Sequence, residues 1–112
     1  MSVTAAKGFK AHGASVGIKA DGVPDAALVV ADAPAAAAAV FTQNRAPAAP
    51  VQRSRQHMEA SASMVRGVLL TSGNANAATG EAGLATVDAL LAAVAEGIGC
   101  EAAELLACQT GL

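Results

Sequence analysis

The chain has 112 residues and a net charge of −2, and it is 54% hydrophobic but only 2% aromatic. The seven basic residues are scattered and Tyr and Trp are absent, so there is neither a basic stripe nor a stacking platform for nucleic acid. No run is long and apolar enough to span a bilayer, and residues 1–17 lack the apolar core of a secretory signal. We therefore expect a cytoplasmic protein that binds neither nucleic acid nor membranes.

The two cysteines, Cys100 and Cys108, are not arranged as a CxxC pair. In a cytosolic protein this pattern favours free thiols over a disulfide. Both histidines, His12 and His57, are far from the cysteines in the sequence, so no metal site is predicted.

The first half of the chain predicts three strands and a helix. "SVGIKA" (15–20) is a short strand among glycine-rich loops, and "DAALVVAD" (25–32) is a buried strand bounded by acids. "PAAAAAVFT" (34–42) is ambiguous between helix and strand, and we favour a strand that closes a hairpin with 25–32. "PVQRSRQHMEASASM" (50–64) predicts an exposed helix that begins after Pro50.

The second half alternates strands with a helix. "VRGVLLTS" (65–72) and "AELLACQT" (103–110) read as strands. Between them, apolar residues recur at three- and four-residue spacing and predict a helix from Gly83 to Ile98 with one buried stripe, formed by Leu84, Val87, Leu91, Val94 and Ile98. Glu81 suits the positive end of this helix, and Gly97 and Gly99 mark its end. Without the ambiguous segment, the order is strand, strand, helix, strand, helix, strand, which is an α/β chain.

Residues 72–80, "SGNANAATG", form a loop that is unusually rich in turn formers and amide side chains. Asn and Gly tolerate left-handed backbone conformations, and Asn side chains bond to nearby backbone groups. We favour a scaffolding role for Asn74 and Asn76, with direct substrate contact as the alternative.

The chain ends just past its last strand, at the edge where sites form in α/β proteins. We therefore expect an incomplete single domain over residues 1–112.

Four segments together resemble the ornithine acetyltransferase family, the glutamate N-acetyltransferases of arginine biosynthesis. They come in the family's order and spacing: "GFKAHGASVGIKADGVPDAALVVAD", "AAVFTQNRAPAAPVQRSR", "GVLLTSGNANAATG" and "LLACQTGL". The resemblance covers nearly the whole chain. Two positions depart from the family pattern, which usually has Cys in place of Ala78 and Ser in place of Gln109.

The resemblance implies the N-terminal part of the α chain of an enzyme built like the N-terminal nucleophile hydrolases. That fold, of the DmpA and ornithine acetyltransferase type, has stacked sheets flanked by helices. A precursor of this family cuts itself before a threonine, which becomes the nucleophile. Acetyl passes from N-acetylornithine to this threonine and then to glutamate, without a cofactor, and some members also accept acetyl-CoA. The implied partners are the rest of the α chain and the β chain in a hetero-oligomer, and the nucleophile lies outside these 112 residues.

The resemblance also assigns an oxyanion hole to Thr110 and Gly111. A threonine hydroxyl is a stiff donor, and a glycine lets a backbone N–H approach a carbonyl closely. From the dipeptide alone, a plain turn after a strand would be the better interpretation.

For Phe41, Thr42 and Asn44, core and turn roles are favoured over shaping a site wall. Lys19 is expected to be solvated or ion-paired, and neither histidine suggests a catalytic triad.

Three functions remain open from the sequence. The first is the acetyltransferase segment, which supplies oxyanion donors to a threonine encoded further on. The second is a non-catalytic remnant or subunit fragment that stabilises a partner. The third is a secondary-metabolism relative that acetylates another amine, an alternative that the departures at Ala78 and Gln109 leave open.

Overall fold

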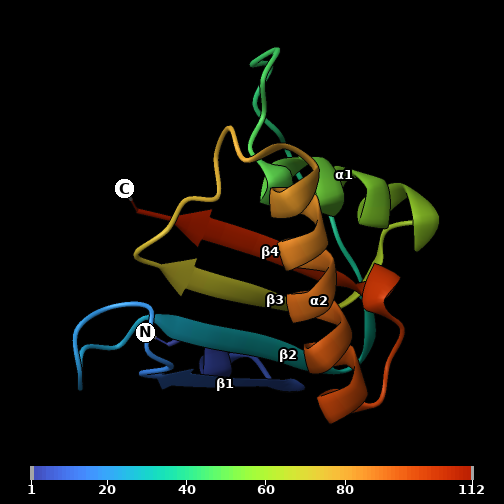
Figure 1. Ribbon diagram of the computed structural model, residues 1–112. Helices are drawn as coiled ribbons and strands as arrows, with labels where there is room; N and C mark the ends of the chain where they lie inside the picture. Colours follow the sequence, from blue (N-terminus) through green and yellow to red (C-terminus); the bar gives the residue numbers. More distant parts are fainter. Residues whose placement is uncertain (1, 112) are drawn as a thin grey trace.

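The computed structural model describes residues 2–111 as one mixed four-stranded sheet, with one helix across a face of the sheet and a second along its edge (Figure 1). The strands are β1 (Phe9–Ala14), β2 (Ala26–Ala36), β3 (Met64–Ser72) and β4 (Leu105–Thr110), in that order across the sheet. β1, β2 and β3 pair antiparallel, whereas β3 and β4 are parallel. The predicted α/β class is confirmed.

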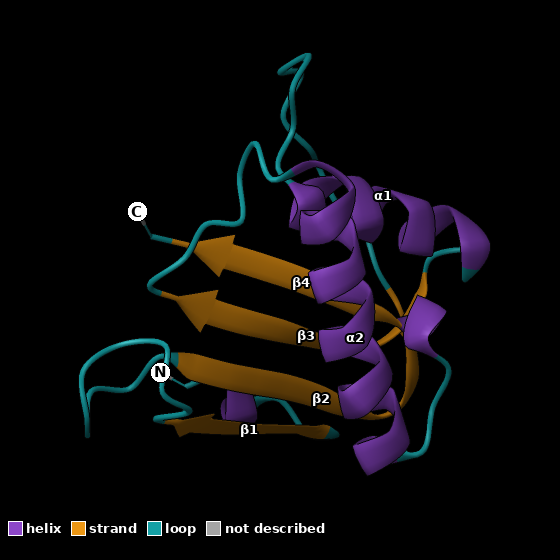
Figure 2. Ribbon diagram, in the orientation of Figure 1, coloured by secondary structure: helices purple, strands orange, loops and turns teal. Residues whose placement is uncertain are grey.

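The helices are α1 (Ala49–Ala60) and α2 (Gly80–Ile98), and short 3-10 turns lie at Val3–Ala5 and Ala102–Glu104 (Figure 2). Both predicted helices are present, but α1 ends at Ala60 rather than at residue 64, where β3 begins, and it buries Ala49, Pro50 and Ser54. Pro50 lies in the first turn of α1, where the missing N–H costs no hydrogen bond. Gly99 ends α2 in a left-handed conformation, with φ of 73°. Neither helix is both long and apolar enough, within the described residues, to cross a membrane.

The core lies between α2 and the adjacent face of the sheet. Val87, Leu91 and Leu105 are fully buried there, which confirms the predicted stripe of α2. Leu69 of β3 and Ala107 of β4 pack into the same cluster. Because side chains alternate along a strand, the intervening residues of β3 and β4 face the other side.

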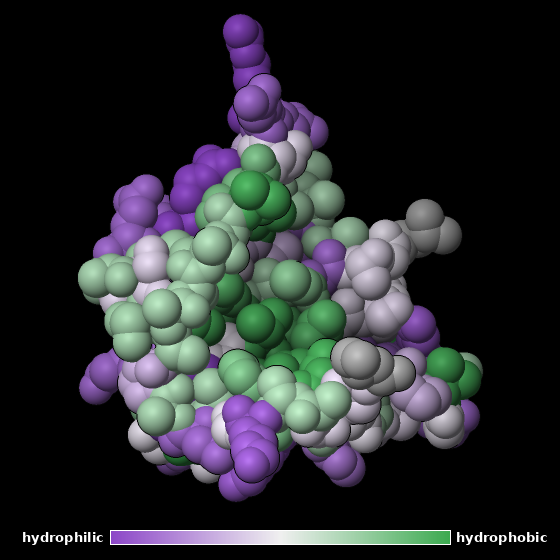
Figure 3. All heavy atoms as spheres, turned by 180° about the vertical axis from the view of Figure 1, so that it is seen from behind, coloured by the Kyte–Doolittle hydropathy of each residue, from purple (hydrophilic) through white to green (hydrophobic). Residues whose placement is uncertain are grey.

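Among the described residues, no α-helix covers that other side of the sheet, which is largely apolar (Figure 3). Its hollows are lined by residues that include Phe9, Val29, Val68 and Leu106. Leu70 retains 38% of its surface exposed. Side chains of this kind are normally covered by another layer.

Helix α1 closes the outer edge of β4 with side chains. The Ser54 hydroxyl accepts from the Ala107 N–H at 2.9 Å and lies 3.1 Å from the Ala107 carbonyl oxygen. His57 Nδ1 lies 2.8 Å from the Leu105 carbonyl oxygen. These bonds occupy backbone groups that would otherwise pair with another strand.

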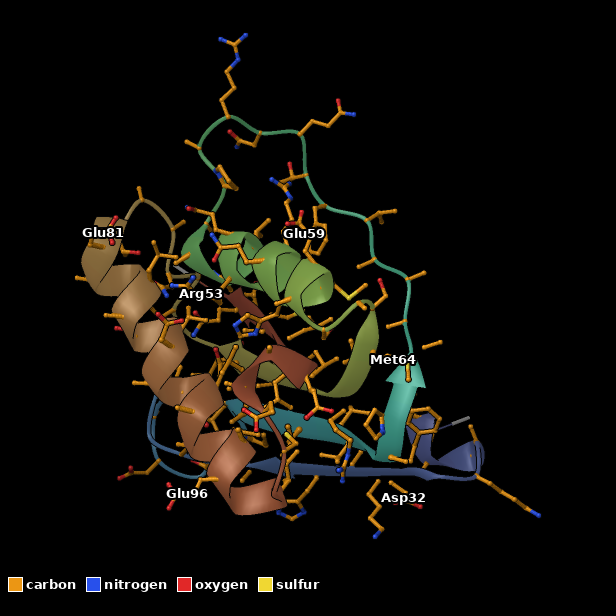
Figure 4. All side chains as sticks on the ribbon, turned by 90° about the vertical axis from the view of Figure 1, so that its right-hand side faces the viewer. Asp32, Arg53, Glu59, Met64, Glu81 and Glu96 are labelled. Atoms are coloured by element: carbon orange, nitrogen blue, oxygen red, sulfur yellow. The ribbon has the colours of Figure 1, made fainter. Side chains whose placement is uncertain are left out.

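An ion pair joins the two helices. Arg53 Nη2 of α1 donates to Asp88 Oδ2 of α2 at 2.7 Å. Figure 4 shows Arg53 between the helices, whereas Glu81 and Glu96 point away from them at the two ends of α2. The acid in the first turn of α2 is thus placed as predicted.

The predicted strand at residues 15–20 is wrong, because the strand is β1 and these residues form the following loop. Gly17 has φ of +91°, which an extended strand does not allow. The N–H groups of Val16, Ile18 and Lys19 donate to the Asp25 carboxylate instead of to a strand.

The predicted hairpin between residues 25–32 and 34–42 is also wrong. Residues 34–36 continue β2, while residues 37–42 are irregular. β2 already has β1 on one side and β3 on the other, so neither edge is free. The register with β3 shifts between Val30 and Ala35, around Pro34, which has no N–H for the ladder.

Candidate functional site

The carboxyl ends of β3 and β4 meet at one edge of the sheet. The two strands are parallel and pair Ser72 with Thr110, so their carboxyl ends lie side by side (Figure 1). The Gly73 N–H donates to the Thr110 carbonyl oxygen at 2.9 Å and extends the pairing past the end of β3. Sites in α/β sheets form at such edges.

Thr110 is exposed on the face of β4 away from the helices. Leu105 and Ala107 are buried against the helices, and strand alternation puts Thr110 on the opposite side. Its backbone is fixed by β3, whereas its side chain lines a hollow with Ser72 and Leu70. The hydroxyl is therefore accessible from the uncovered apolar face of the sheet.

Gly111 has φ of +131°, a region that favours glycine. A methyl group built on it would lie 2.5 Å from the Gly73 carbonyl carbon and 2.7 Å from the Asn74 nitrogen. Only a residue without a side chain fits against this backbone. The Thr110–Gly111 segment thus lies directly against the start of the asparagine loop.

Asn76 holds the asparagine loop together. It is 6% exposed and has φ of +51°. Its Nδ2 donates to the Gly83 carbonyl oxygen and to Gln109 Oε1, both at 3.0 Å, and its Oδ1 accepts from Thr79 Oγ1 at 2.6 Å. Asn74 Oδ1 accepts from the Asn76 N–H at 2.8 Å. These bonds support a scaffolding role for both asparagines, which also line the neighbouring cavity.

Gly83 gives the loop room to pack on α2. A methyl group there would overlap Thr79 Oγ1 and lie 2.5 Å from Asn76 Oδ1. On the other side, Gln109 Nε2 donates to Thr71 Oγ1 at 3.2 Å. The loop, the helix and both strand ends therefore share one polar network, beside a cavity of about 410 Å³.

The other residues singled out in the first half have local roles. Phe41 lies under the guanidinium of Arg55, 5.3 Å from ring centroid to Cζ. The Asn44 N–H donates to Thr42 Oγ1, and the Ala46 N–H donates to Asn44 Oδ1. The predicted turn roles are confirmed for Thr42 and Asn44, while Phe41 also lines an apolar hollow of about 430 Å³ beside β4.

The remaining candidates lie apart from the strand ends. His12 is exposed on β1, and His57 is bonded to the Leu105 carbonyl oxygen from α1. Cys100 and Cys108 are free, as expected. Burial and the nearby Glu104 carboxylate raise the pKa of the Cys100 thiol, a shift that disfavours the thiolate.

Asp25 is the site residue that sequence reasoning missed. It is 2% exposed at the start of β2, and hydrogen bonds from the Val16 and Lys19 backbone N–H groups lower its pKa below 3.8. In the sequence it is only the polar boundary of a predicted strand. The available signal was an acid that follows a glycine-containing loop and opens a buried apolar run.

This arrangement offers hydrogen-bond donors rather than a nucleophile. A hydroxyl on Thr110 and a backbone N–H on Gly111 sit on consecutive residues whose backbone is fixed by neighbours. Such donors suit an oxygen that acquires negative charge during acyl transfer. Within residues 2–111 no three His, Cys, Asp or Glu side chains cluster in a way that could hold a metal ion.

Comparison with known sequences gives a consistent result. The ArgJ family model matches residues 10–112. The arginine biosynthesis bifunctional protein ArgJ of Streptomyces coelicolor is 49% identical over 113 residues, which is 100% of this chain and 29% of that protein. Its counterpart in Thermosynechococcus vestitus is 46% identical over 110 residues, which is 98% of this chain and 26% of that protein. The chain thus spans little more than a quarter of these relatives.

Two solved structures have the same fold. The arginine biosynthesis bifunctional protein ArgJ of Bacillus halodurans superposes with a TM-score of 0.93 at 34% identity, covering 100% of this chain and 58% of that one. The ornithine acetyltransferase of Mycobacterium tuberculosis, solved with ornithine, gives a TM-score of 0.84 at 46% identity, covering 98% and 59%. These likenesses confirm the expected fold type.

Proposed function

Because this chain belongs to the ArgJ family, we propose that it forms the oxyanion-binding part of an acetyltransferase. In this proposal the enzyme moves an acetyl group from N-acetylornithine to glutamate, as a step of arginine biosynthesis. The observation that supports it most directly is the Thr110–Gly111 segment at the joined carboxyl ends of β3 and β4. The hydroxyl and the N–H of this pair are donors of the kind that acyl transfer needs.

The proposed reaction has two halves. In the first, the hydroxyl of a threonine outside these 112 residues attacks the acetyl carbonyl, forming a tetrahedral intermediate. Its oxyanion accepts hydrogen bonds from Thr110 and Gly111. Collapse breaks the C–N bond, and ornithine leaves with the proton from the threonine hydroxyl. In the second, the glutamate amine attacks the acetyl ester, and N-acetylglutamate leaves as the threonine regains its proton.

The open apolar face of the sheet agrees with this proposal. Thr110 is on that face, so the donors would lie at the boundary between this sheet and a second layer. In the proposal that layer comes from the rest of the α chain and from the β chain, and it carries the nucleophile. No cofactor takes part, and acetyl-CoA is an alternative acetyl donor.

The test uses the full-length gene product. Incubation with N-acetylornithine and isotopically labelled glutamate should give labelled N-acetylglutamate and free ornithine in equal amounts, without added acetyl-CoA. Intact mass measured on the same preparation shows whether a longer precursor is made and cut into two chains. A folded, processed protein that releases no ornithine would refute the proposal.

A further inference from the structure

The loop between β1 and β2, residues 15–24, is held by a single carboxylate. Asp25 Oδ1 accepts from the Val16 N–H at 2.7 Å. Its Oδ2 accepts from the Ile18 N–H at 2.6 Å and from the Lys19 N–H at 2.9 Å. A carboxylate with three short backbone bonds fixes the path of the chain around it.

Ile18 and Lys19, whose N–H groups donate to Asp25 Oδ2, also pack against Gly73. A methyl group built on Gly73 would lie 2.7 Å from Ile18 Cγ2 and 3.1 Å from Lys19 Cγ. The Asp25 main chain also reaches this point, because its carbonyl oxygen accepts from the Ser72 N–H at 2.8 Å. Asp25 therefore holds the loop with its side chain and the end of β3 with its backbone.

Gly73 lies in turn against Gly111. The Gly73 N–H donates to the Thr110 carbonyl oxygen, and a methyl group on Gly111 would lie 2.8 Å from Gly73 Cα. Residues 18–19, the end of β3 at Gly73 and the end of β4 at Gly111 therefore lie close together, and the absence of side chains on Gly73 and Gly111 allows this approach. In Figure 1 the loop before β2 and the ends of β3 and β4 lie at the same end of the sheet.

We propose that Asp25 is a positioning residue for the oxyanion donors. Its carboxylate holds Ile18 and Lys19 against Gly73, and Gly73 in turn fixes the Thr110–Gly111 segment. The chemical meaning of this role rests on the proposed function, whereas the mechanical link between Asp25 and Gly73 stands without it. A general stabilising role for Asp25 is the competing explanation.

The first test measures amide hydrogen exchange in the full-length gene product. Asp25→Asn keeps the side-chain shape but replaces one accepting oxygen with an amide group. We expect faster exchange at the N–H groups of Ile18, Lys19 and Gly73. Asp21→Asn, the same chemical change at an exposed position of the same loop, should leave all three unchanged. Unaltered protection at Gly73 in Asp25→Asn would overturn the proposal.

The second test separates positioning from stability by kinetics. Loosened donors act on the transition state, so Asp25→Asn should lower kcat by ~10–100-fold with little change in KM. In a Thr110→Ala background the same change should cost much less, because both act through one group of donors. Equal fold losses in both backgrounds would mean that Asp25 acts independently of Thr110, which would overturn the proposal.

Ile18→Ala provides a second variant in case Asp25→Asn does not fold. Ile18 is 42% exposed, and its removal weakens the contact on Gly73 without touching the carboxylate. We expect a smaller loss of kcat in the same direction and faster exchange at Gly73. If neither change occurred, the proposed path would be wrong. If the parent itself transferred no acetyl group, the proposed function would fail, yet the exchange experiment would still decide the link to Gly73.

Discussion

Thr110→Ala gives the sharpest test of the oxyanion assignment. The hydroxyl is exposed at the end of β4, while the backbone is held by the bond from the Gly73 N–H. Removing it should therefore change the free energy of unfolding by less than about 0.5 kcal/mol, as for other surface positions. Loss of one oxyanion donor costs ~10²–10³ in rate, or about 3–4 kcal/mol. The catalytic effect should thus exceed the stability effect several-fold.

The assay is acetyl transfer from N-acetylornithine to glutamate by processed enzyme. Because the oxyanion exists only in the transition state, kcat should fall while KM changes little. Thr110→Ser keeps a hydroxyl and serves as the matched control, with most of the activity retained. If Thr110→Ala turned over within about threefold of the parent, the loss would be far smaller than that expected for removing an oxyanion donor. Thr110 and Gly111 would then be interpreted as a plain turn after a strand.

Three further outcomes follow from burial, charge and exposed surface. Leu91 has no exposed surface, so Leu91→Ala should lower the free energy of unfolding by about 2–5 kcal/mol. Leu90 is 36% exposed, so Leu90→Ala should lower it far less. Equal urea midpoints for the two variants would contradict the assigned buried face of α2. The pKa of Asp25 is lower in the folded protein than its ordinary value of 3.8. Its ionised carboxylate therefore stabilises the fold at any pH above 3.8, and this stabilisation is lost as the pH falls through the pKa of the folded state. The difference in urea midpoint between parent and Asp25→Asn should accordingly shrink below that pH. The isolated chain should self-associate on gel filtration because one face of its sheet is uncovered and apolar, and a monomer with cooperative unfolding would argue against this.

The elements with a strong hydrophobic period were predictable from the sequence. The stripe through Leu91 gave α2, and the apolar run before the asparagine loop gave β3. Both depend on local patterns that burial then reinforces. The helix after Pro50 was equally readable, since its start carries a local signal.

The strand at 25–32 was predicted from its apolar run and is part of β2, but two neighbouring segments could not be predicted in the same way. Residues 15–20 have a strand-like composition, yet their N–H groups bond to Asp25, up to nine positions further on. The alanine-rich run after Pro34 carries no period that tells strand from coil. Its conformation depends on which neighbours β2 already has. In both cases tertiary contacts outweigh local propensity.

The site was predictable only in part for a related reason. The resemblance supplied Thr110 and Gly111, but nothing in the sequence shows that Gly111 lies against Gly73, 38 positions earlier, or that Ile18 packs against Gly73. Such contacts between glycines leave no side-chain pattern to detect. They are found only when the backbones are placed.

The position next to the donor pair shows why neighbouring residues can have separate roles. Gln109, where the family pattern usually has Ser, faces the helices and bonds to Asn76 and Thr71. Thr110 faces the opposite side of the sheet, because side chains alternate along β4. A serine is too short to bridge both partners from the backbone of β4, so the longer amide changes the support of the asparagine loop. The departure at Gln109 therefore alters the scaffold beneath the site and leaves the proposed oxyanion donors, Thr110 and Gly111, in place.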